Sequence, residues 1–360
     1  MGRSRIAPVV RLIEPGALSP LHSQTTYHAI ARALRPGDEP VLSLYWTDRP
    51  YVCTGFHRPV EELDLDECRR RGLPVLRRQL GGGPVYLDAD QLLFQVTLPA
   101  EAAPGGVEAA YRALLGPAVL AFRRLGLDAA LAGANDICVG GRKLSGTGMA
   151  RIGDAVVCVG NFILDFDHQA MADILALEPG MRRTFAAVQR RYLTTLRREL
   201  GRTVSRAEAR DAIVASYAEA FGPLEPSRLM PAEEDARAEL DVLFSSREWL
   251  VEEGTGWVDL VRQAKIRGGA RVYATAVERD GVELSATFAV VDGRLEDVAF
   301  TSTALTAKLR ARLSSAMAGL AAEREALLGA ARAAMRAAAG PLRPEDVVEC
   351  LLRSEQGRAT

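Results

Sequence analysis

The spacing of hydrophobic residues predicts alternating helices and strands along the first part of the chain. Apolar residues recur at helical spacing in residues 22–35, 61–71, 107–126, 182–201 and 205–221. Ser23 is the candidate N-cap of the first of these helices. Shorter apolar runs predict strands at 74–78, 92–98 and 155–164, a strand opening at Tyr86, and two strands within 40–56 joined by a turn at Thr47–Pro50. The run at 155–164 is apolar almost throughout, which favours burial on both faces.

The C-terminal part has a different, sharper pattern. Three alternating segments predict strands at Ala270–Arg279, Val282–Val291 and Arg294–Thr301. Asp-Gly pairs separate them at 280–281 and 292–293, and such pairs favour tight hairpin turns. An Ala-rich stretch at 304–338 then predicts a long helical region.

A looser connection separates the two patterns. Residues 222–230 contain two prolines, and the acidic run at 233–235 is typical of a solvated loop. We therefore place a domain boundary near residues 245–260. Trp249 and Trp257 flank this boundary and are candidates for packing the smaller domain onto the larger one.

Composition narrows the class of protein. The chain has 360 residues, 48% of them hydrophobic, with 45 basic and 46 acidic side chains. This balance argues against nucleic-acid binding through bulk charge. No apolar stretch approaches the length of a membrane span, and the N-terminus does not resemble a signal peptide. The five cysteines form no CxxC pair and the four histidines have no ligand-like spacing, so we expect a reduced, cytoplasmic protein without a structural metal, a membrane partner or a nucleic-acid partner.

Lysine is scarce in this chain. Its only lysines are Lys143, Lys265 and Lys308, and the rest of its 45 basic residues are arginines. An ammonium is a compact point charge, whereas a guanidinium is a wide planar fork, so the two are not interchangeable at a tight site. The surroundings of each lysine therefore indicate where chemistry lies.

A glycine-rich segment at 77–88 reads RRQLGGGPVYLD. Three successive glycines let a backbone approach a ligand closely, and their N–H groups can face an anion. The arginines that precede them can add bidentate contacts to the same anion. The alternative is a tight turn with solvated arginines. The segment matches neither the phosphate-binding P-loop nor the GxGxxG pattern.

A second segment at 135–151 reads NDICVGGRKLSGTGMAR and contains Lys143. Its glycine pair predicts a hairpin between arms at 137–139 and 142–146. A lysine held there can place its ammonium between a carboxylate and a phosphate and stabilise charge that develops between them. The alternative is an exposed hairpin lysine.

Together, these two segments resemble the lipoate–protein ligase family, within the larger group of biotin and lipoyl ligases. The family patterns RRxxGGGxVYxD and NDIxxxGRKxSGxxxxR occur at 77–88 and 135–151, and the strand that follows occurs as GNFILDFD at 160–167. The resemblance covers roughly residues 20–220. It extends more weakly to the K-x-x-G-G opening of the family's accessory domain, at Lys265, Gly268 and Gly269.

The resemblance implies a two-step reaction. Lipoate and ATP give lipoyl-AMP and pyrophosphate, and the lipoyl group then passes to a lysine of an acceptor protein such as an H protein, a dehydrogenase E2 or a specialised lipoate-binding protein. Lys143 matches the family's catalytic lysine. Asp136 matches the magnesium side. The residues implied to bind substrate or adenylate are Arg78, Gly81, Gly82, Gly83, Val85, Asn135, Asp136, Ser145, Gly146 and Gly160.

The chain departs from the family pattern at three places. The family often has serine where this chain has Leu80 and histidine where it has Leu87, and it often has His-Gly-Thr where this chain has Val159-Gly160-Asn161. These departures suggest a shifted acyl substrate, a distinct subfamily or reduced activity.

Three alternatives stay open. An octanoyltransferase of the same fold uses a cysteine nucleophile, but the two chain regions where relatives carry it hold Asp128 and the segment 178–180. Cys138 and Cys158 flank the lysine motif and are more typical of core residues. A biotin ligase is disfavoured by the RRQLGGGP loop, and a non-catalytic lipoyl-binding protein remains.

The expected fold is α/β in the broad sense (α+β). We predict a biotin/lipoyl ligase-like catalytic domain over residues 1–245, with a mixed and mainly antiparallel sheet. A small α+β accessory domain is predicted over residues 260–360.

Overall fold

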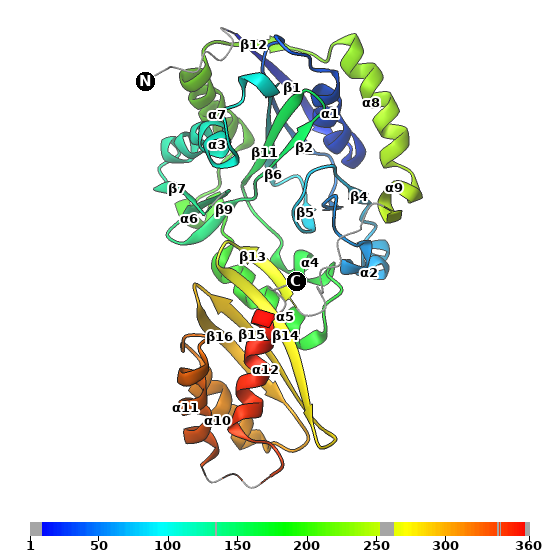
Figure 1. Cartoon of the computed structure of the whole chain (residues 1–360). Coiled ribbons are helices and arrows are strands. Elements are labelled where there is room, and N and C mark those ends of the chain that lie inside the picture. Colours follow the sequence, from blue (N-terminus) through cyan, green and yellow to red (C-terminus); the bar gives the residue numbers. More distant parts are fainter. Residues whose placement is uncertain (1–8, 134, 253–262, 337, 339, 357–360) are drawn as a thin grey trace. The chain divides into compact units, whose positions relative to one another are not determined.

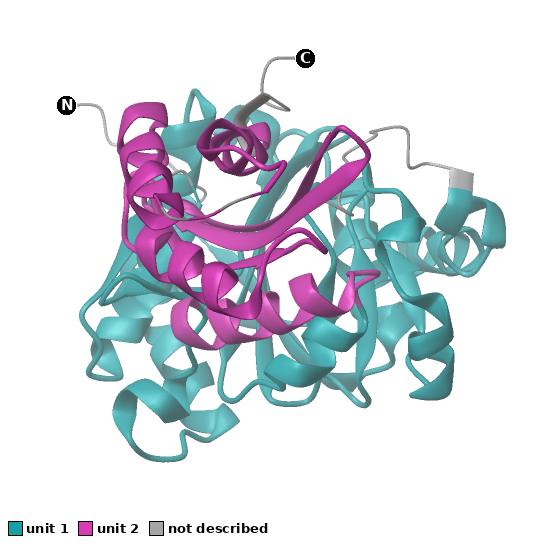
Figure 2. Cartoon of the chain, turned by 90° about the horizontal axis from the view of Figure 1, so that it is seen from below, with its two compact units in different colours: residues 1–174, 193–258 teal, residues 175–192, 259–360 magenta. Residues whose placement is uncertain are grey.

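A computed structural model describes residues 9–133, 135–252, 263–336, 338 and 340–356 (Figure 1). The chain divides into two compact units, coloured separately in Figure 2. Unit 1 takes residues 1–174 and 193–258, and unit 2 takes residues 175–192 and 259–360. Unit 2 therefore receives one segment from the middle of the chain, which the sequence pattern did not indicate.

Unit 1 is built on a six-stranded sheet with the order β10-β11-β6-β2-β1-β12. The strands are β1 (Val10–Leu18), β2 (Val41–Thr47), β6 (Gln91–Pro99), β10 (Gly148–Ile152), β11 (Ala155–Ile163) and β12 (Leu224–Ser227). Pairing is antiparallel from β10 to β2 and parallel from β2 to β12. All nine residues of β6 are buried, as expected for a central strand covered on both faces.

Alternate residues of β6 enter two different hydrophobic cores. Phe94 and its even-numbered neighbours pack with α3 (Val107–Arg124) and α7 (Arg206–Phe221). Leu93 joins the core of α1 (Pro20–Ala33), and α8 (Pro231–Phe244) packs along α1. Since successive strand residues face opposite sides, helices cover both faces of the sheet.

Two three-stranded sheets carry the sequence motifs of unit 1. The first has the order β4-β3-β5, with β3 at Tyr51–Thr54, β4 at Val75–Arg77 and β5 at Val85–Leu87. The second has the order β7-β8-β9, with β7 at Ala129–Ala132, β8 at Asp136–Val139 and β9 at Arg142–Ser145. The smaller helices of this unit are η1 (Val60–Glu62), α2 (Leu65–Arg70), η2 (Ala100–Ala102), α4 (His168–Asp173), α6 (Leu196–Leu200) and α9 (Arg247–Glu252).

Unit 2 is a four-stranded antiparallel sheet with helices packed on it. The strands follow chain order: β13 (Gln263–Arg267), β14 (Ala270–Arg279), β15 (Val282–Val291) and β16 (Arg294–Thr301). Asp280 and Gly281 both have positive φ, at 52° and 76°, as a tight primed turn requires. The second turn, Asp292-Gly293, repeats this geometry and confirms both predicted hairpins. The helices are α5 (Pro179–Tyr192), α10 (Ala307–Met317), α11 (Arg324–Met335) and α12 (Pro344–Gln356).

Several expectations about helices were wrong. The stretch 182–201 is two helices, because Leu193 and Thr194 pair with Lys143 and Thr195 caps α6. The stretch 304–338 is likewise divided between α10 and α11, where Gly319 has a φ of +82°. The N-cap of α1 is Ser19 rather than Ser23, whose buried hydroxyl donates to the carbonyl of Pro20.

The segment 222–245 is ordered structure and not a loose connection. β12 extends the sheet beside β1, and α8 begins at Pro231. Glu233 is almost fully buried and accepts two hydrogen bonds from the Arg11 guanidinium, at 2.7 and 3.0 Å. The acidic run was misread as a solvated loop because its tertiary partner, Arg11, lies far away in sequence.

The role predicted for Trp249 was also wrong. Its ring stacks on Phe244 at 4.9 Å between centroids and lies 5.7 Å from Phe56, and all three residues belong to unit 1. Trp249 therefore anchors α9 within that unit. Trp257 lies outside the described residues.

Candidate active site

Lys143 lies on β9 of the predicted hairpin. Gly140 and Gly141 have φ of +50° and +74°, so a residue with a side chain would be strained at either position of the turn. The Lys143 ammonium contacts the Asp136 carboxylate on β8, with Nζ 2.7 Å from Oδ1. The side chains are 18% and 5% exposed, respectively. A buried carboxylate thus fixes the ammonium in a partly enclosed position, where charge is poorly screened.

Asn135 closes the base of this hairpin. Its side-chain amide donates to the carbonyl of Thr147 at 3.0 Å, and the Thr147 hydroxyl donates back to the carbonyl of Asn135. This reciprocal pair ties the segment before Asp136 to the segment after Gly146. Asn135, Asp136, Lys143, Ser145 and Gly146 therefore form one local structure.

The backbone of Lys143 is held from a second side. The N–H of Thr194 donates to its carbonyl at 2.8 Å, in a short parallel bridge with Leu193. Arg142 makes two hydrogen bonds, at 2.7 and 2.6 Å, to the Glu199 carboxylate of α6. The Arg142 guanidinium holds the pKa of Glu199 below its usual range. No pattern in the sequence indicated these partners.

Arg78 holds the glycine loop in its folded shape. Its guanidinium donates to the carbonyls of Gly81 at 2.8 Å, Gly83 at 2.9 Å and Cys53 at 3.1 Å. Gly82 has a φ of +94°. In this conformation the loop is organised by its own arginine.

A close backbone contact between Gly55 and Gly82 fixes the position of the glycine loop. A Cβ on Gly55 would come within 2.0 Å of the carbonyl oxygen of Gly82. The backbone near β3 and the glycine loop can be this close only because residue 55 lacks a side chain.

Arg77 has a structural role. Its side chain is fully buried and donates to the carbonyls of Gly55, Phe56 and Arg58 and to those of Trp249 and Leu250 in α9. The prediction that both arginines contact an anion does not hold for Arg77 in this structure, because backbone carbonyls surround its guanidinium.

His28 supports the glycine-loop segment through a hydrogen bond with Gln79, and it was not predicted as a site residue. Its Nε2 accepts a hydrogen bond from the N–H of Gln79 at 3.1 Å, so Nδ1 carries the proton and donates to the carbonyl of Gln24 at 2.6 Å. Burial lowers the pKa of His28 to about 3. The ring is therefore neutral at physiological pH.

Gly160 and Asn161 on β11 link the lysine hairpin to the central sheet. A Cβ on Gly160 would come within 2.3 Å of the Phe94 ring, so this position requires glycine. The side-chain oxygen Oδ1 of Asn161 accepts a hydrogen bond from the N–H of Gly146 at 2.8 Å, and its Nδ2 donates to Gln91 Oε1 at 2.8 Å. Asn161 was not predicted as a site residue, although it stands in the departure at 159–161.

The apolar departures belong to a hydrophobic core. Leu80 is 1% exposed and Leu87 is 8% exposed, and Val159 packs against the core that contains them. A Cβ on Gly148 would lie 3.7 Å from both Leu80 and Val159. The glycine loop and strands β10 and β11 therefore meet at an apolar contact next to Val85, which packs on the same core.

The predicted accessory motif lies at the turn between β13 and β14 of unit 2. Lys265 is exposed on β13, and Gly268-Gly269 lead into β14. Gly269 has a φ of +77°, and a Cβ there would come within 2.4 Å of Asp292 Oδ1. Arg267 bonds Asp292 at 2.7 Å and lies over the Tyr192 ring. This motif thus stabilises a turn of unit 2.

All five cysteines are in the described part of the chain, and all are buried. Cys138 lies opposite Lys143 in the strand register and is 8% exposed. Burial raises the pKa of Cys158 to about 12, which keeps that thiol protonated.

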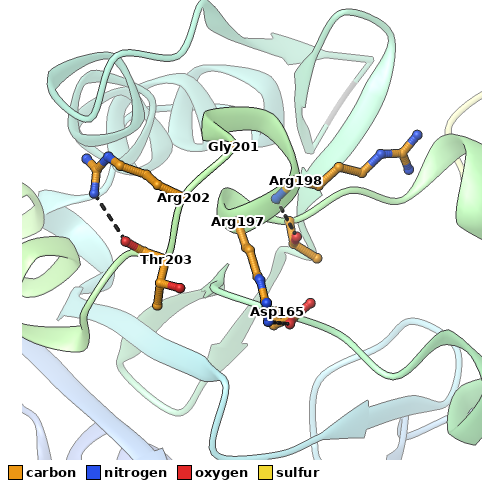
Figure 3. A pocket seen from close by; sticks show the side chains of 7 residues that line it. Asp165, Arg197, Arg198, Gly201, Arg202 and Thr203 are labelled. Atoms are coloured by element: carbon orange, nitrogen blue, oxygen red, sulfur yellow. Dashed lines mark hydrogen bonds and ion pairs between the residues drawn. The ribbon is translucent and has the colours of Figure 1, made fainter.

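An open pocket of about 570 Å³ lies beside α6, and none of the predicted site residues lines it (Figure 3). It is lined by Asp165, Thr195, Arg197, Arg198, Gly201, Arg202 and Thr203. Arg197 pairs with Asp165 at 2.9 Å, and Arg202 donates to the carbonyl of Thr203 at 3.3 Å. The pocket is a second polar feature of unit 1.

Comparison with known families identifies this arrangement. The family model described as "Lipoyl protein ligase A/B catalytic domain" matches residues 19–218, which include the glycine loop, the lysine hairpin and β11. The chain belongs to this family. The resemblance inferred from the two motifs is therefore confirmed, as is the mixed α/β fold.

Relatives of the lipoyl protein ligase A/B family include transferases and ligases. The octanoyltransferase LipM of Symbiobacterium thermophilum is 30% identical over 266 residues, which cover 66% of this chain and 97% of that protein. Lipoate-protein ligase A subunit 1 of Thermoplasma acidophilum is 34% identical over 111 residues, covering 31% of this chain and 42% of that protein. Membership of this family supports the conclusion that the chain is an enzyme acting on lipoyl or octanoyl groups.

Solved structures agree with this family fold. The bipartite lipoate protein ligase of Thermoplasma acidophilum, solved in a study with its E2 lipoyl domain, has 25% identity and a TM-score of 0.63, covering 71% of this chain and all of that one. The lipoate-bound LipL1 of P. falciparum has a TM-score of 0.52 and 14% identity, covering 97% of this chain and 99% of that one, and supports the fold alone.

Two further observations bear on this family member. None of the helices within the described ranges is long and apolar enough to cross a membrane. Nor do the described residues include three or more His, Cys, Asp or Glu side chains arranged to hold a metal ion. Asp136 can serve as a single carboxylate ligand to a magnesium ion held mainly by nucleotide phosphates, a common mode for Mg²⁺.

Proposed function

We propose that this protein is an ATP-dependent lipoate–protein ligase, which activates lipoate as lipoyl-AMP and transfers the lipoyl group to a lysine of a lipoyl-domain acceptor. The observation that carries the proposal is the 2.7 Å contact between Lys143 and Asp136 in the hairpin. An ammonium fixed by a buried carboxylate suits stabilisation of a phosphate-centred transition state, in which negative charge grows on oxygen.

In the first step, a lipoate carboxylate oxygen attacks the α-phosphorus of ATP, and the bond to the pyrophosphate oxygen breaks. Pyrophosphate leaves with the electron pair. Lys143 donates hydrogen bonds to the carboxylate and phosphate oxygens on which charge develops. Bound Mg²⁺ would supply charge neutralisation on the phosphates, with Asp136 as its protein ligand. The backbone of Gly81, Gly82 and Gly83, with Val85 beside it, would line the adenylate, and Arg78 would hold that loop.

In the second step, the neutral amine of the acceptor lysine attacks the acyl carbon of lipoyl-AMP. The mixed anhydride bond breaks, AMP leaves with the electron pair, and the amine loses a proton to solvent. No enzyme nucleophile is needed. This agrees with the burial of all five cysteines.

The chain organisation adds a proposal about domains. We propose residues 1–245 as the catalytic domain and residues 260–360 as an accessory domain. Lys265, Gly268 and Gly269 would act within it. The proposed location of the reaction is the cytoplasm, and the proposed acceptors are an H protein, a dehydrogenase E2 or a specialised lipoate-binding protein.

An octanoyltransferase is the second candidate. It is favoured by the near full-length match to octanoyltransferase LipM of Symbiobacterium thermophilum. A transferase of this kind needs a thiol that forms a thioester, and Cys138 is the thiol that faces Lys143 across the hairpin. The burial of Cys138 argues against this role.

The deciding experiment is release of pyrophosphate from Mg-ATP with lipoate, octanoate or biotin and with no acceptor present. The ligase predicts a burst with lipoate or octanoate and none with biotin. Absence of release, together with a mass increase of one octanoyl group on incubation with an octanoyl thioester donor, would favour the transferase. Cys138→Ser is the matched variant, since it should lose that mass increase in a transferase and keep the burst in a ligase.

A further inference from the structure

A buried amide, that of Gln91, and a half-buried amide, that of Asn161, form a continuous hydrogen-bonded connection between the two motifs. Asn161 on β11 accepts from the N–H of Gly146 at 2.8 Å and donates to Gln91 Oε1 at 2.8 Å. Gln91 on β6 is 1% exposed and donates to the carbonyl of Tyr86 at 3.1 Å and to Asp88 Oδ1 at 3.4 Å. The connection runs from Tyr86 and Asp88, at the end of the glycine-loop segment, to Gly146, three positions after Lys143.

The backbone fixes the orientation of both amides. A backbone N–H can only donate, so the Asn161 atom that faces Gly146 must be its oxygen. A backbone carbonyl can only accept, so the Gln91 atom that faces Tyr86 must be its nitrogen. The two remaining atoms, Asn161 Nδ2 and Gln91 Oε1, then meet as donor and acceptor. The amide orientation that Gly146 requires of Asn161 is therefore consistent with the orientation that Tyr86 requires of Gln91.

The connection ends beside the catalytic lysine. A Cβ on Gly146 would lie 3.9 Å from Lys143 Cε and 3.8 Å from Asn161 Oδ1. The Asn161 backbone N–H also donates to Ser145 Oγ at 3.3 Å. Asn161 thus holds both residues that follow Leu144, and it sets where the strand carrying Lys143 ends.

We propose that Asn161 is a positioning residue, which acts with Gln91 to fix the lysine hairpin relative to the glycine-loop segment. This inference rests on the proposed function for its kinetic part, because the activity it tunes is adenylate formation. Asn161 needs no contact with the reacting atoms. It works by keeping Ser145 and Gly146 in one position while charge develops near Lys143.

Two substitutions separate the parts of this role. Asn161→Leu has a similar shape and removes all three side-chain hydrogen bonds of Asn161, including the one that Ser145 Oγ donates to Asn161 Oδ1 at 3.4 Å. Asn161→Asp keeps an acceptor for Gly146 but places a carboxylate against Gln91 Oε1, so Gln91 must rotate and give up its bond to Tyr86. The matched control is Gln95→Leu, which removes a buried amide on the same strand that accepts from Ser43 at 2.8 Å and reaches neither motif.

The experiment measures lipoate-dependent pyrophosphate release and amide hydrogen exchange at Gly146. We expect kcat to fall roughly 10- to 100-fold in both Asn161 variants, since small displacements of a catalytic group cost that much. KM for lipoate should change by less than about threefold, because the lost interaction acts in the transition state. Exchange at Gly146 should accelerate about 10-fold in Asn161→Leu and stay slow in Asn161→Asp. Gln95→Leu should change neither quantity.

Three results overturn the proposal: unchanged exchange at Gly146 in Asn161→Leu, full activity of Asn161→Asp, or an equal loss of kcat in Gln95→Leu. If the wild-type protein releases no pyrophosphate, the proposed function fails, whereas the exchange measurement still decides whether Asn161 fixes the hairpin.

Discussion

The N–H of Thr194 donates to the carbonyl of Lys143 at 2.8 Å, which ties the chain leaving α5 to the strand of the candidate catalytic lysine. Helix α5 belongs to unit 2, and Thr194 stands two residues after its last turn, in unit 1. One step further, Glu199 of α6 bonds Arg142, the neighbour of Lys143. The strand of the candidate catalytic lysine is thus held by the segment through which the chain returns from unit 2.

Loss of the Glu199 carboxylate should weaken this attachment. Arg142 lowers the pKa of Glu199 in the folded state, so the pair stabilises the protein above the ordinary glutamate pKa, and this contribution is lost as pH falls through the folded pKa. We expect Glu199→Gln to lower the free energy of unfolding by about 1 kcal/mol at pH 7, because Arg142 is partly solvated. Urea unfolding at pH 7 and at pH 3 measures this change in the free energy of unfolding. A difference from wild type that is as large at pH 3 as at pH 7 would contradict the assignment.

Replacement of Lys143 tests the argument from lysine scarcity. Lys143→Ala should abolish adenylate formation. Lys143→Arg should fail nearly as completely, because a planar guanidinium cannot occupy the position of an ammonium held 2.7 Å from Asp136. Pyrophosphate release is the measurement, and Lys308→Arg, on α10 of unit 2, is the control. Near wild-type turnover of Lys143→Arg would show that this position does not require a compact ammonium.

The buried His28 predicts a specific acid sensitivity. Its folded pKa, about 3, lies below the ordinary histidine value near 6.5. Between these values the unfolded chain binds a proton that the folded protein does not, so stability falls as pH decreases through this range. The slope for one proton is about 1.4 kcal/mol per pH unit. We expect His28→Gln to be less stable at pH 7 and to lose this slope, as followed by denaturant unfolding between pH 7 and pH 4. An unchanged slope in the variant would show that His28 titrates normally in the fold.

Two glycines near the loop should respond differently to a methyl group. Gly55→Ala places a Cβ against the backbone oxygen of Gly82, which cannot move without displacing the loop, and overpacking of this kind costs about 1–3 kcal/mol. No heavy atom lies within 4 Å of a Cβ on Gly81, so Gly81→Ala should leave stability unchanged. If the loop backbone approaches the adenylate, Gly81→Ala should still reduce pyrophosphate release. Thermal unfolding and activity together distinguish the two positions, and equal melting temperatures for both variants would refute the packing argument.

Truncation tests the proposed division of labour between the domains. A chain ending after Glu252 keeps α9, whose Trp249 and Leu250 carbonyls bind Arg77. We expect it to lose lipoate activation while it still transfers the acyl group of preformed lipoyl-AMP. Both half-reactions are measured with the same acceptor domain. An equal loss in both, in a folded truncated protein, would contradict a specific role of residues 260–360 in activation.

The sequence by itself determined the elements whose causes are local. The hairpin turns at Asp280 and Asp292 follow from the conformations that Asp-Gly pairs adopt, and β6 was identified from the apolar-rich run at 92–98. Lys143 and its glycine turn were likewise visible in the chain, because residues 136–143 form one hairpin. Their pairing with Asp136 needs no distant partner.

Only the tertiary structure decided the features that join distant segments. Arg77 and Arg78 are neighbours in sequence, yet one is buried among the carbonyls of α9 and the other holds the glycine loop. Glu233 looked like part of a solvated run until Arg11 was placed beside it. Asn161, Gln91 and His28 carry no local signal, since a side-chain amide or imidazole acquires its role from the backbone groups that other strands and helices bring to it. Long-range contacts of this kind depend on how the sheets pack, which no short window of sequence contains.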